Sequence, residues 1–163
     1  MSNPRFLRQK WTFRAGERQV VLIKSPNERP THVVMKALLW ALYMPQYPDI
    51  SIEIRLQDRY KPDVVAFDAE QRPLFWGEAG QVGADKLRAL FKRYRATHFA
   101  VAKWETRLDP VEALVRDALD GLRRSAPVDL INFTDANAEG AIAADGALTL
   151  DFAALEWRRI SLD

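Results

Sequence analysis

Residues 62–80, PDVVAFDAEQRPLFWGEAG, form the stretch that decides the fold. Two short apolar runs, 62–67 and 73–79, flank the turn residues 68–72, which is typical of a β-hairpin. Asp63 opens the first run and Glu78 lies near the end of the second. Because the first residue of one hairpin strand lies near the last residue of the other, we expect Asp63 and Glu78 to lie side by side.

Two adjacent carboxylates repel each other unless a cation bridges them or one of them holds a proton. Hard oxygen ligands without cysteine or clustered histidine suit Mg²⁺ or Mn²⁺ better than Zn²⁺. The hairpin therefore predicts a candidate metal site at Asp63 and Glu78. The residues alone leave a second interpretation open, in which Asp63 caps a turn and Glu78 pairs with a nearby Arg or Lys.

Further elements follow from hydrophobic periodicity on both sides of the hairpin. The second of two N-terminal strands is rich in β-branched residues, and residues 50–56 alternate apolar and polar side chains. A helix with an apolar face at positions 87, 90, 91 and 94 follows the hairpin. The expected strands are 6–13, 18–24, 50–56, 62–67, 73–79, 98–102 and 128–133, and the expected helices are 32–44, 84–95 and 109–124.

Capping residues and turn residues give further expectations about where elements begin and end. Either Asn27 or Thr31 could cap the first helix. Residues 135–137 read as a loop, and Asp145-Gly146 indicates a late hairpin. The strand–helix–strand unit at 73–102 predicts at least one parallel pair, so we expect a mixed α/β fold.

The composition sets the class of protein. The chain has 163 residues, 48% of them hydrophobic and 28% charged, with no cysteine. This length predicts a single domain over 1–163, and the lack of cysteine excludes disulfides, thiolate metal sites and thiol nucleophiles. No apolar window approaches 18 residues and no secretory signal is evident, so we expect a cytoplasmic protein without a membrane partner.

The net charge of +2 hides a gradient along the chain. Residues 1–62 carry +6, residues 63–109 carry +1 and residues 110–163 carry −5. A basic first third is compatible with a phosphate-rich partner, although surface charge varies along any chain. The near-balanced total is therefore no argument against a nucleic-acid substrate.

The ordered set of these features resembles the PD-(D/E)XK nuclease superfamily and, within it, the bacterial YaeQ family. The resemblance rests on Pro26-Asn27-Glu28 before a helix containing Leu38-Leu39-Trp40, on Pro62-Asp63, on Glu78-Ala79-Gly80 and on the late Asp145-Gly146-Ala147-Leu148 segment. It implies a restriction-endonuclease-like α-β-β-β-α-β core, mapped to 32–44, 50–56, 62–67, 73–79, 84–95 and 98–102. The mixed sheet would carry added N- and C-terminal β-hairpins.

The resemblance also implies a function. Asp63 and Glu78 match the two metal-binding acids, and Glu28 matches a third acid that many members place before the first helix. Such sites bind Mg²⁺, or Mn²⁺, and hydrolyse phosphodiester bonds of nucleic acid, here expected to be DNA. The alternative is a catalytically inactive binding or regulatory protein that retains the nuclease fold.

One position departs from the pattern. The lysine expected two residues after Glu78 is replaced by Gly80. Either the site is inactive, or a cation from the next helix substitutes for the lysine, with Lys86 the first candidate and Arg88 the second. Gln81 is a further candidate for contact with water. Lys86 could equally be an ordinary solvated helix side chain.

Two weaker signals complete the list of candidates. Gly77, Gly80 and Gly83 lie between a strand and a helix, but their spacing is not that of a phosphate-binding loop. A nucleotide-binding enzyme would use Gly80–Gly83. His32 and His98 are the only histidines, so no histidine-rich metal site is possible.

Overall fold

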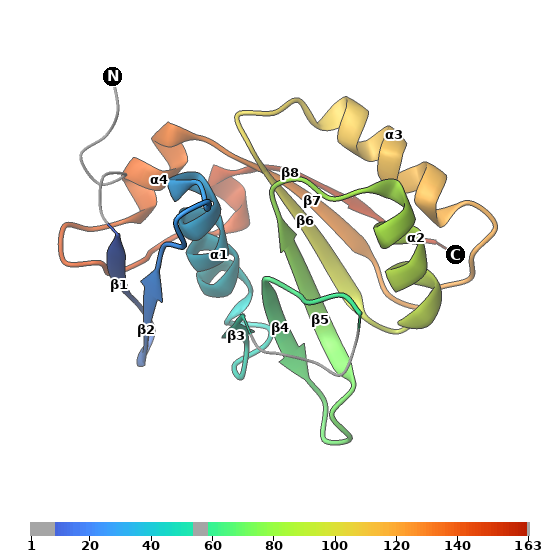
Figure 1. Cartoon of the computed structure of the whole chain (residues 1–163), viewed down its shortest axis with the longest axis horizontal. Coiled ribbons are helices and arrows are strands. Elements are labelled where there is room, and N and C mark those ends of the chain that lie inside the picture. The colour runs from blue at the N-terminus through green and yellow to red at the C-terminus, as the bar shows by residue number, and fades with distance from the viewer. Residues whose placement is uncertain (1–8, 54–58, 163) are drawn as a thin grey trace.

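The computed structural model describes residues 9–53 and 59–162, and it contains a six-stranded mixed sheet with the strand order β3-β4-β5-β6-β7-β8 (Figure 1). Strands β3, β4 and β5 are antiparallel, β5, β6 and β7 are parallel, and β8 is antiparallel to β7. The strands span Ser51–Ile52, Val64–Phe67, Pro73–Ala79, His98–Trp104, Val128–Phe133 and Glu156–Ile160. The expected hairpin and the expected parallel pair are both present.

Helices cover both faces of this sheet (Figure 1). Helix α1 (Pro30–Tyr43) packs on one face, whereas α2 (Ala84–Arg93) and α3 (Leu108–Leu119) pack together on the other. Successive residues of β5 point to opposite faces, so Phe75 belongs to the α1 core and Trp76 to the α2–α3 core. The protein therefore has two hydrophobic cores separated by the sheet.

The N-terminal hairpin is also present. Strand β1 (Lys10–Ala15) pairs with β2 (Arg18–Ile23) in a separate two-stranded antiparallel sheet. A two-residue turn joins them, and Gly16 adopts the positive φ of +56° that such tight turns favour. Trp11 and Phe13 of β1 are buried against the α1 core. The residues 6–8 of the expected strand lie outside the described residues.

The C-terminal prediction was wrong in part. The expected loop at 135–137 begins helix α4 (Asp135–Ala141), because Thr134 and Asn137 form a reciprocal capping box. The expected late hairpin is reduced to a turn at Gly146, closed by a single bridge between Ile142 and Leu148. A short 3-10 helix, η2 (Phe152–Ala154), then precedes β8.

Other element boundaries differ by a few residues from the predicted ones. Helix α1 begins at Pro30 and has Arg29 at its N-cap without a side-chain hydrogen bond, so neither Asn27 nor Thr31 is its cap. Helix α3 ends at Leu119 rather than at 124, and β6 continues to Trp104. Strand β3 is short, and residues 54–58 of its expected range lie outside the described residues. Within the described part of the chain, no helix is long and apolar enough to cross a membrane.

Candidate metal centre and adjoining clefts

Asp63 immediately precedes β4, and Glu78 lies in the neighbouring strand β5, at one end of the sheet. The register pairs Val64 with Gly77, and the Asp63 N–H continues the ladder by donating to the Gly77 carbonyl at 3.0 Å. The Asp63 Oδ2 atom accepts a hydrogen bond from the Ala79 N–H at 2.8 Å. The two acids, called the acid pair below, are therefore cross-strand neighbours, as their sequence spacing indicates.

Glu78 is the more buried member of the acid pair, with 4% of its surface exposed. Its Oε1 atom lies 2.7 Å from Lys86 Nζ and accepts a hydrogen bond from Trp76 Nε1 at 3.1 Å. Burial raises the pKa of Glu78, and the hydrogen bond and charge of Lys86 only partly offset that effect. The negative charge of Asp63 also works to raise this pKa. Lys86 thus reaches the acid pair from the first turns of α2.

Glu28 does not join the acid pair directly. His32 lies between the two acids, with Nδ1 at 2.6 Å from Glu28 Oε2 and Nε2 at 3.3 Å from Asp63 Oδ1. The hydrogen bond to Asp63 is the largest cause of a raised His32 pKa, because carboxylates on both ring nitrogens favour the doubly protonated ring. Sequence reasoning missed His32, although its spacing of four residues from Glu28 across a helix start was visible.

Lys36 also pairs with Glu28, at the same oxygen that His32 contacts. The Lys36 side chain is buried, with Nζ 2.7 Å from Glu28 Oε2 and also paired with Glu53. Burial works to raise the pKa of Glu28, but the hydrogen bonds from Lys36, Ser25 and His32 outweigh it, and the pKa falls below its usual value. Glu28 therefore lies in a charge network of its own, one histidine away from the acid pair.

Gly80 occupies the position where the motif lysine was expected, and the backbone conformation at this position explains why glycine is found there. Its φ is +87°, a left-handed conformation that L side chains rarely adopt. The Gly80 N–H donates to the Ala102 carbonyl at 2.9 Å, which places Gly80 beside the end of β6. There Lys103 Nζ donates a hydrogen bond to the Gly80 carbonyl at 2.7 Å. A second strand therefore brings a cation to this position, which sequence reasoning missed.

The two accessory candidates, Gln81 and Arg88, lie in different surroundings. Gln81 is exposed and lines both clefts described below. Arg88 donates to the carbonyls of Ala118 and Asp120 at 3.3 and 2.8 Å, so it ties α2 to the end of α3. The structure removes Arg88 from the group around the acid pair and keeps Lys86.

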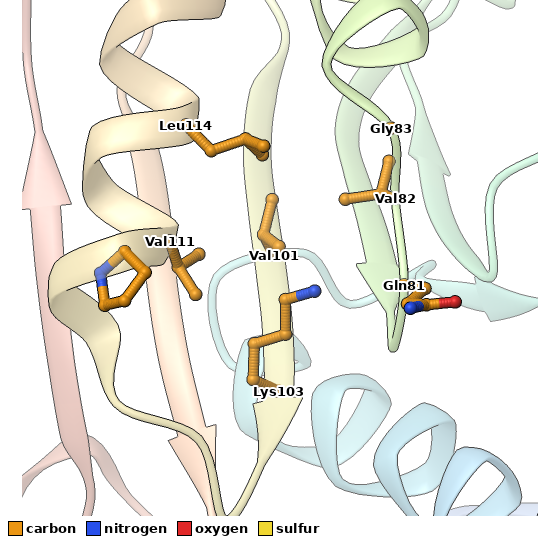
Figure 2. Close-up of a pocket in the computed structure, with 8 residues that line it drawn as sticks. Gln81, Val82, Gly83, Val101, Lys103, Val111 and Leu114 are labelled. Atoms are coloured by element: carbon orange, nitrogen blue, oxygen red, sulfur yellow. The ribbon is translucent and has the colours of Figure 1, made fainter.

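Two clefts meet at this end of the sheet. The first cleft, of about 650 Å³, lies on the α1 side and is lined by residues that include Glu28, His32, Gly80 and Trp104. The second cleft, of about 470 Å³, lies between the segment 81–83 and α3 (Figure 2). Gln81 and Lys103 line both. Asp63 approaches the first cleft through its contact with His32.

The donor set fits a cation with few protein ligands. Within residues 9–53 and 59–162, no three His, Cys, Asp or Glu side chains converge closely enough to hold a metal ion. Mg²⁺ retains several waters and is commonly held by one or two carboxylates, so the acid pair alone fits it. A site of three acids that includes Glu28 does not fit this arrangement.

Comparison with known proteins identifies the fold. No protein-family model matches the sequence, and no curated protein matches it. The YaeQ protein from Pseudomonas syringae superposes with a TM-score of 0.57 at 20% identity, covering 82% of this chain and 70% of that one. The YaeQ protein from Xanthomonas axonopodis pv. citri superposes with a TM-score of 0.58 at 17% identity, covering 85% and 81%. At these identities the chain shares the fold of the two YaeQ proteins.

Proposed function

We propose that the chain is a YaeQ-family member of the PD-(D/E)XK superfamily and hydrolyses phosphodiester bonds of nucleic acid with the help of Mg²⁺ or Mn²⁺. The shared fold supports the family proposal. The element order α1-β3-β4-β5-α2-β6 supports the superfamily proposal, because it is the order that the sequence resemblance implies. DNA remains the expected substrate, and a cytoplasmic location remains a prediction.

One observation carries the proposal: a buried acid, Glu78, lies beside Asp63 and is ion-paired with Lys86 at 2.7 Å. Burying a carboxylate is costly, and its raised pKa reports that cost. Perturbed acids beside a cleft are candidates for a functional site. In this proposal Asp63, just before β4, and Glu78 of β5 supply the acidic groups of the motif, and Lys86 of α2 substitutes for its lysine.

The residues have distinct roles in this proposal. A bound Mg²⁺ would supply Lewis-acid stabilisation of the phosphodiester and a more acidic water. Asp63 and Glu78 would hold the ion, with Asp63 oriented by the Ala79 N–H and by His32. Lys86 neutralises Glu78 and lies close enough to stabilise negative charge on a phosphoryl group.

A specific observation favours the runner-up, a non-catalytic protein that retains the fold. The three acids are already paired with cations of the chain, namely Lys86, His32 and Lys36. A set of internal ion pairs can serve structure alone. The two functions differ in whether the acid pair binds a divalent cation and whether nucleic acid is then cleaved.

Calorimetric titration of Mn²⁺ and Mg²⁺ tests the proposal. We expect Asp63→Asn and Glu78→Gln to weaken binding by at least about tenfold, because each removes one of few charged ligands. The matched control is Asp68→Asn, which removes a partly exposed turn carboxylate. Unchanged affinity in both acid-pair variants would overturn the proposal, and metal binding without cleavage of single- or double-stranded DNA would favour the runner-up.

A further inference from the structure

Three lysines with buried or partly buried side chains lie at this end of the sheet, and one of them differs from the others in its partners. Lys36 and Lys86 each contact a carboxylate, Glu28 and Glu78 respectively, at 2.7 Å. Within the described residues, Lys103 has only the main-chain carbonyl described above as a partner. Burial lowers its pKa, and no carboxylate compensates. Lys103 is therefore a partly buried cation whose charge the chain itself leaves unbalanced.

Arg124 is a second cation with no carboxylate partner among the described residues, and it provides a comparison for Lys103. It is buried and donates to three carbonyls, those of Phe91, Tyr94 and Thr97. Lys103 uses one of the three donors of its ammonium group in this way. Lys103 is only partly buried and lines both clefts, so its remaining donors are available to an anionic ligand there.

The second cleft shows what else such a ligand must carry. Val82 lies on one side of this cleft, and Val111 and Leu114 lie on the other (Figure 2). Val101 lies between them on the same face of β6 as Lys103 (Figure 2). Its volume, about 470 Å³, falls within the range of small-molecule sites, which are mostly apolar with a few polar groups. The lining fits an apolar or flat body joined to one negative group.

The location of this cleft strengthens the case for a ligand. It opens at the carboxyl ends of the parallel strands β5 and β6, where ligands of open α/β sheets bind. Lys103 and Gln81 line this cleft and the first cleft. An anion on Lys103 therefore lies at the boundary between the apolar cleft and the cleft lined by His32.

We propose that the second cleft binds one unpaired nucleotide, with its phosphate on Lys103 and its base between Val82 and Leu114. The inference rests on the proposed function and names its substrate class as single-stranded nucleic acid. A base enters such a pocket only after leaving the duplex stack, and unstacking costs least for a strand that is already single. The strand would continue past Gly80 into the first cleft, where Asp63 contacts His32.

The first test measures nucleotide binding without any divalent cation. Thymidine 5′-monophosphate is titrated into ¹⁵N-labelled full-length protein in EDTA. We expect shifts at Val82, Val101 and Leu114, with at least tenfold weaker binding in Lys103→Met and in Leu114→Glu. Lys103→Arg should retain most of the affinity because it keeps the positive charge.

A matched control separates the cleft from general electrostatics. Ala113→Glu adds the same charge to the exposed side of α3, one residue from Leu114, and should leave the affinity unchanged. An equal loss in Ala113→Glu, or equal affinity for inorganic phosphate and the nucleotide, would overturn the proposal. Val82→Glu repeats the test from the opposite wall if Leu114→Glu fails to fold.

The second test uses oligonucleotides in the same EDTA buffer. A short single strand should bind more tightly than the duplex of the same sequence, and Leu114→Glu should remove that preference. Binding of the free nucleotide but not of the single strand would overturn the proposal. Because EDTA removes divalent cations, neither binding result depends on metal binding at the acid pair, so failure of the nuclease proposal and failure of this one are distinguishable.

Discussion

The two ends of the central sheet handle buried charge in opposite ways. At one end, Asp129 on β7 is fully buried and accepts hydrogen bonds from Tyr43 at 2.6 Å and Arg159 at 2.8 and 3.0 Å, while His98 contacts it at 2.7 Å. Tyr47 contacts the other ring nitrogen of His98 at 2.8 Å. These five residues are called the Asp129 cluster below. At the other end, the acid pair contacts Lys86 and His32, and His32 lines the first cleft.

The pKa directions separate the two ends. Burial works to raise the pKa of Asp129, but hydrogen bonds from His98, Arg159 and Tyr43 outweigh it, and the pKa is lowered. For Glu78, burial prevails and the pKa is raised. A fully satisfied charge holds elements together, whereas an incompletely compensated one is available for a ligand. We therefore assign the Asp129 cluster to stability and propose that the acid pair serves function.

Removing Asp129 gives the sharpest test of that assignment. Asp129→Ala should lower the free energy of unfolding by about 3–5 kcal/mol, because Arg159 then loses its carboxylate and Tyr43 and His98 lose their acceptor. Chemical denaturation monitored by tryptophan fluorescence measures it. Asp63→Ala is the comparison, and an equal or larger loss there would erase the distinction between the two ends.

The sequence predicted some elements of the fold well and missed others. The pattern of apolar residues located β5 and α2 closely, because both elements bury regular faces. The adjacency of Asp63 and Glu78 followed from hairpin register alone. Strand β8 was missed because Glu156–Ile160 has no alternation, and α4 was missed because its capping box uses Asn137 in place of Glu or Gln.

Tertiary placement decided the remaining site residues. Lys103 reaches Gly80 only because β5 and β6 are parallel in one particular register, which no local pattern specifies. His32 of helix α1 joins Glu28 to Asp63, which lies far along the chain, just before β4. Hydrophobic periodicity along the sequence cannot predict such long-range contacts, and residues that depend on them make up much of this site.

Replacing Gly80 tests whether the positive φ at this position requires glycine. Gly80→Ala should cost about 1 kcal/mol, because alanine must adopt a left-handed φ of +87° there. The nearest atom to the added methyl group is His32 Cδ2 at 3.8 Å, so crowding contributes little. Gly140→Ala, in helix α4 with open space around it, should instead stabilise slightly. Urea midpoints measure both, and a destabilisation by Gly140→Ala as large as that by Gly80→Ala would show that positive φ is not the cause.

The smallest expected effect is a pH dependence of opposite sign at the two ends. Asp129 has a folded pKa below its unfolded value of 3.8, so its stabilisation is present above pH 3.8 and is lost as the pH falls toward the folded pKa. Glu78 has a folded pKa above its unfolded value of 4.5, so its contribution is complete below pH 4.5 and is lost as the pH rises through the folded pKa.

Glu78→Gln removes that titration. In EDTA, the variant should therefore gain stability relative to the wild type as the pH rises from 4 to 7, measured as the difference in free energy of unfolding. Asp129→Asn should show no such relative gain over this range, because the Asp129 carboxylate titrates below it in both states. A constant difference between wild type and Glu78→Gln across these pH values would mean that Lys86 fully compensates Glu78. The acid pair would then resemble the Asp129 cluster in its electrostatics, and the case for a ligand at this end would rest on Lys103 and the clefts alone.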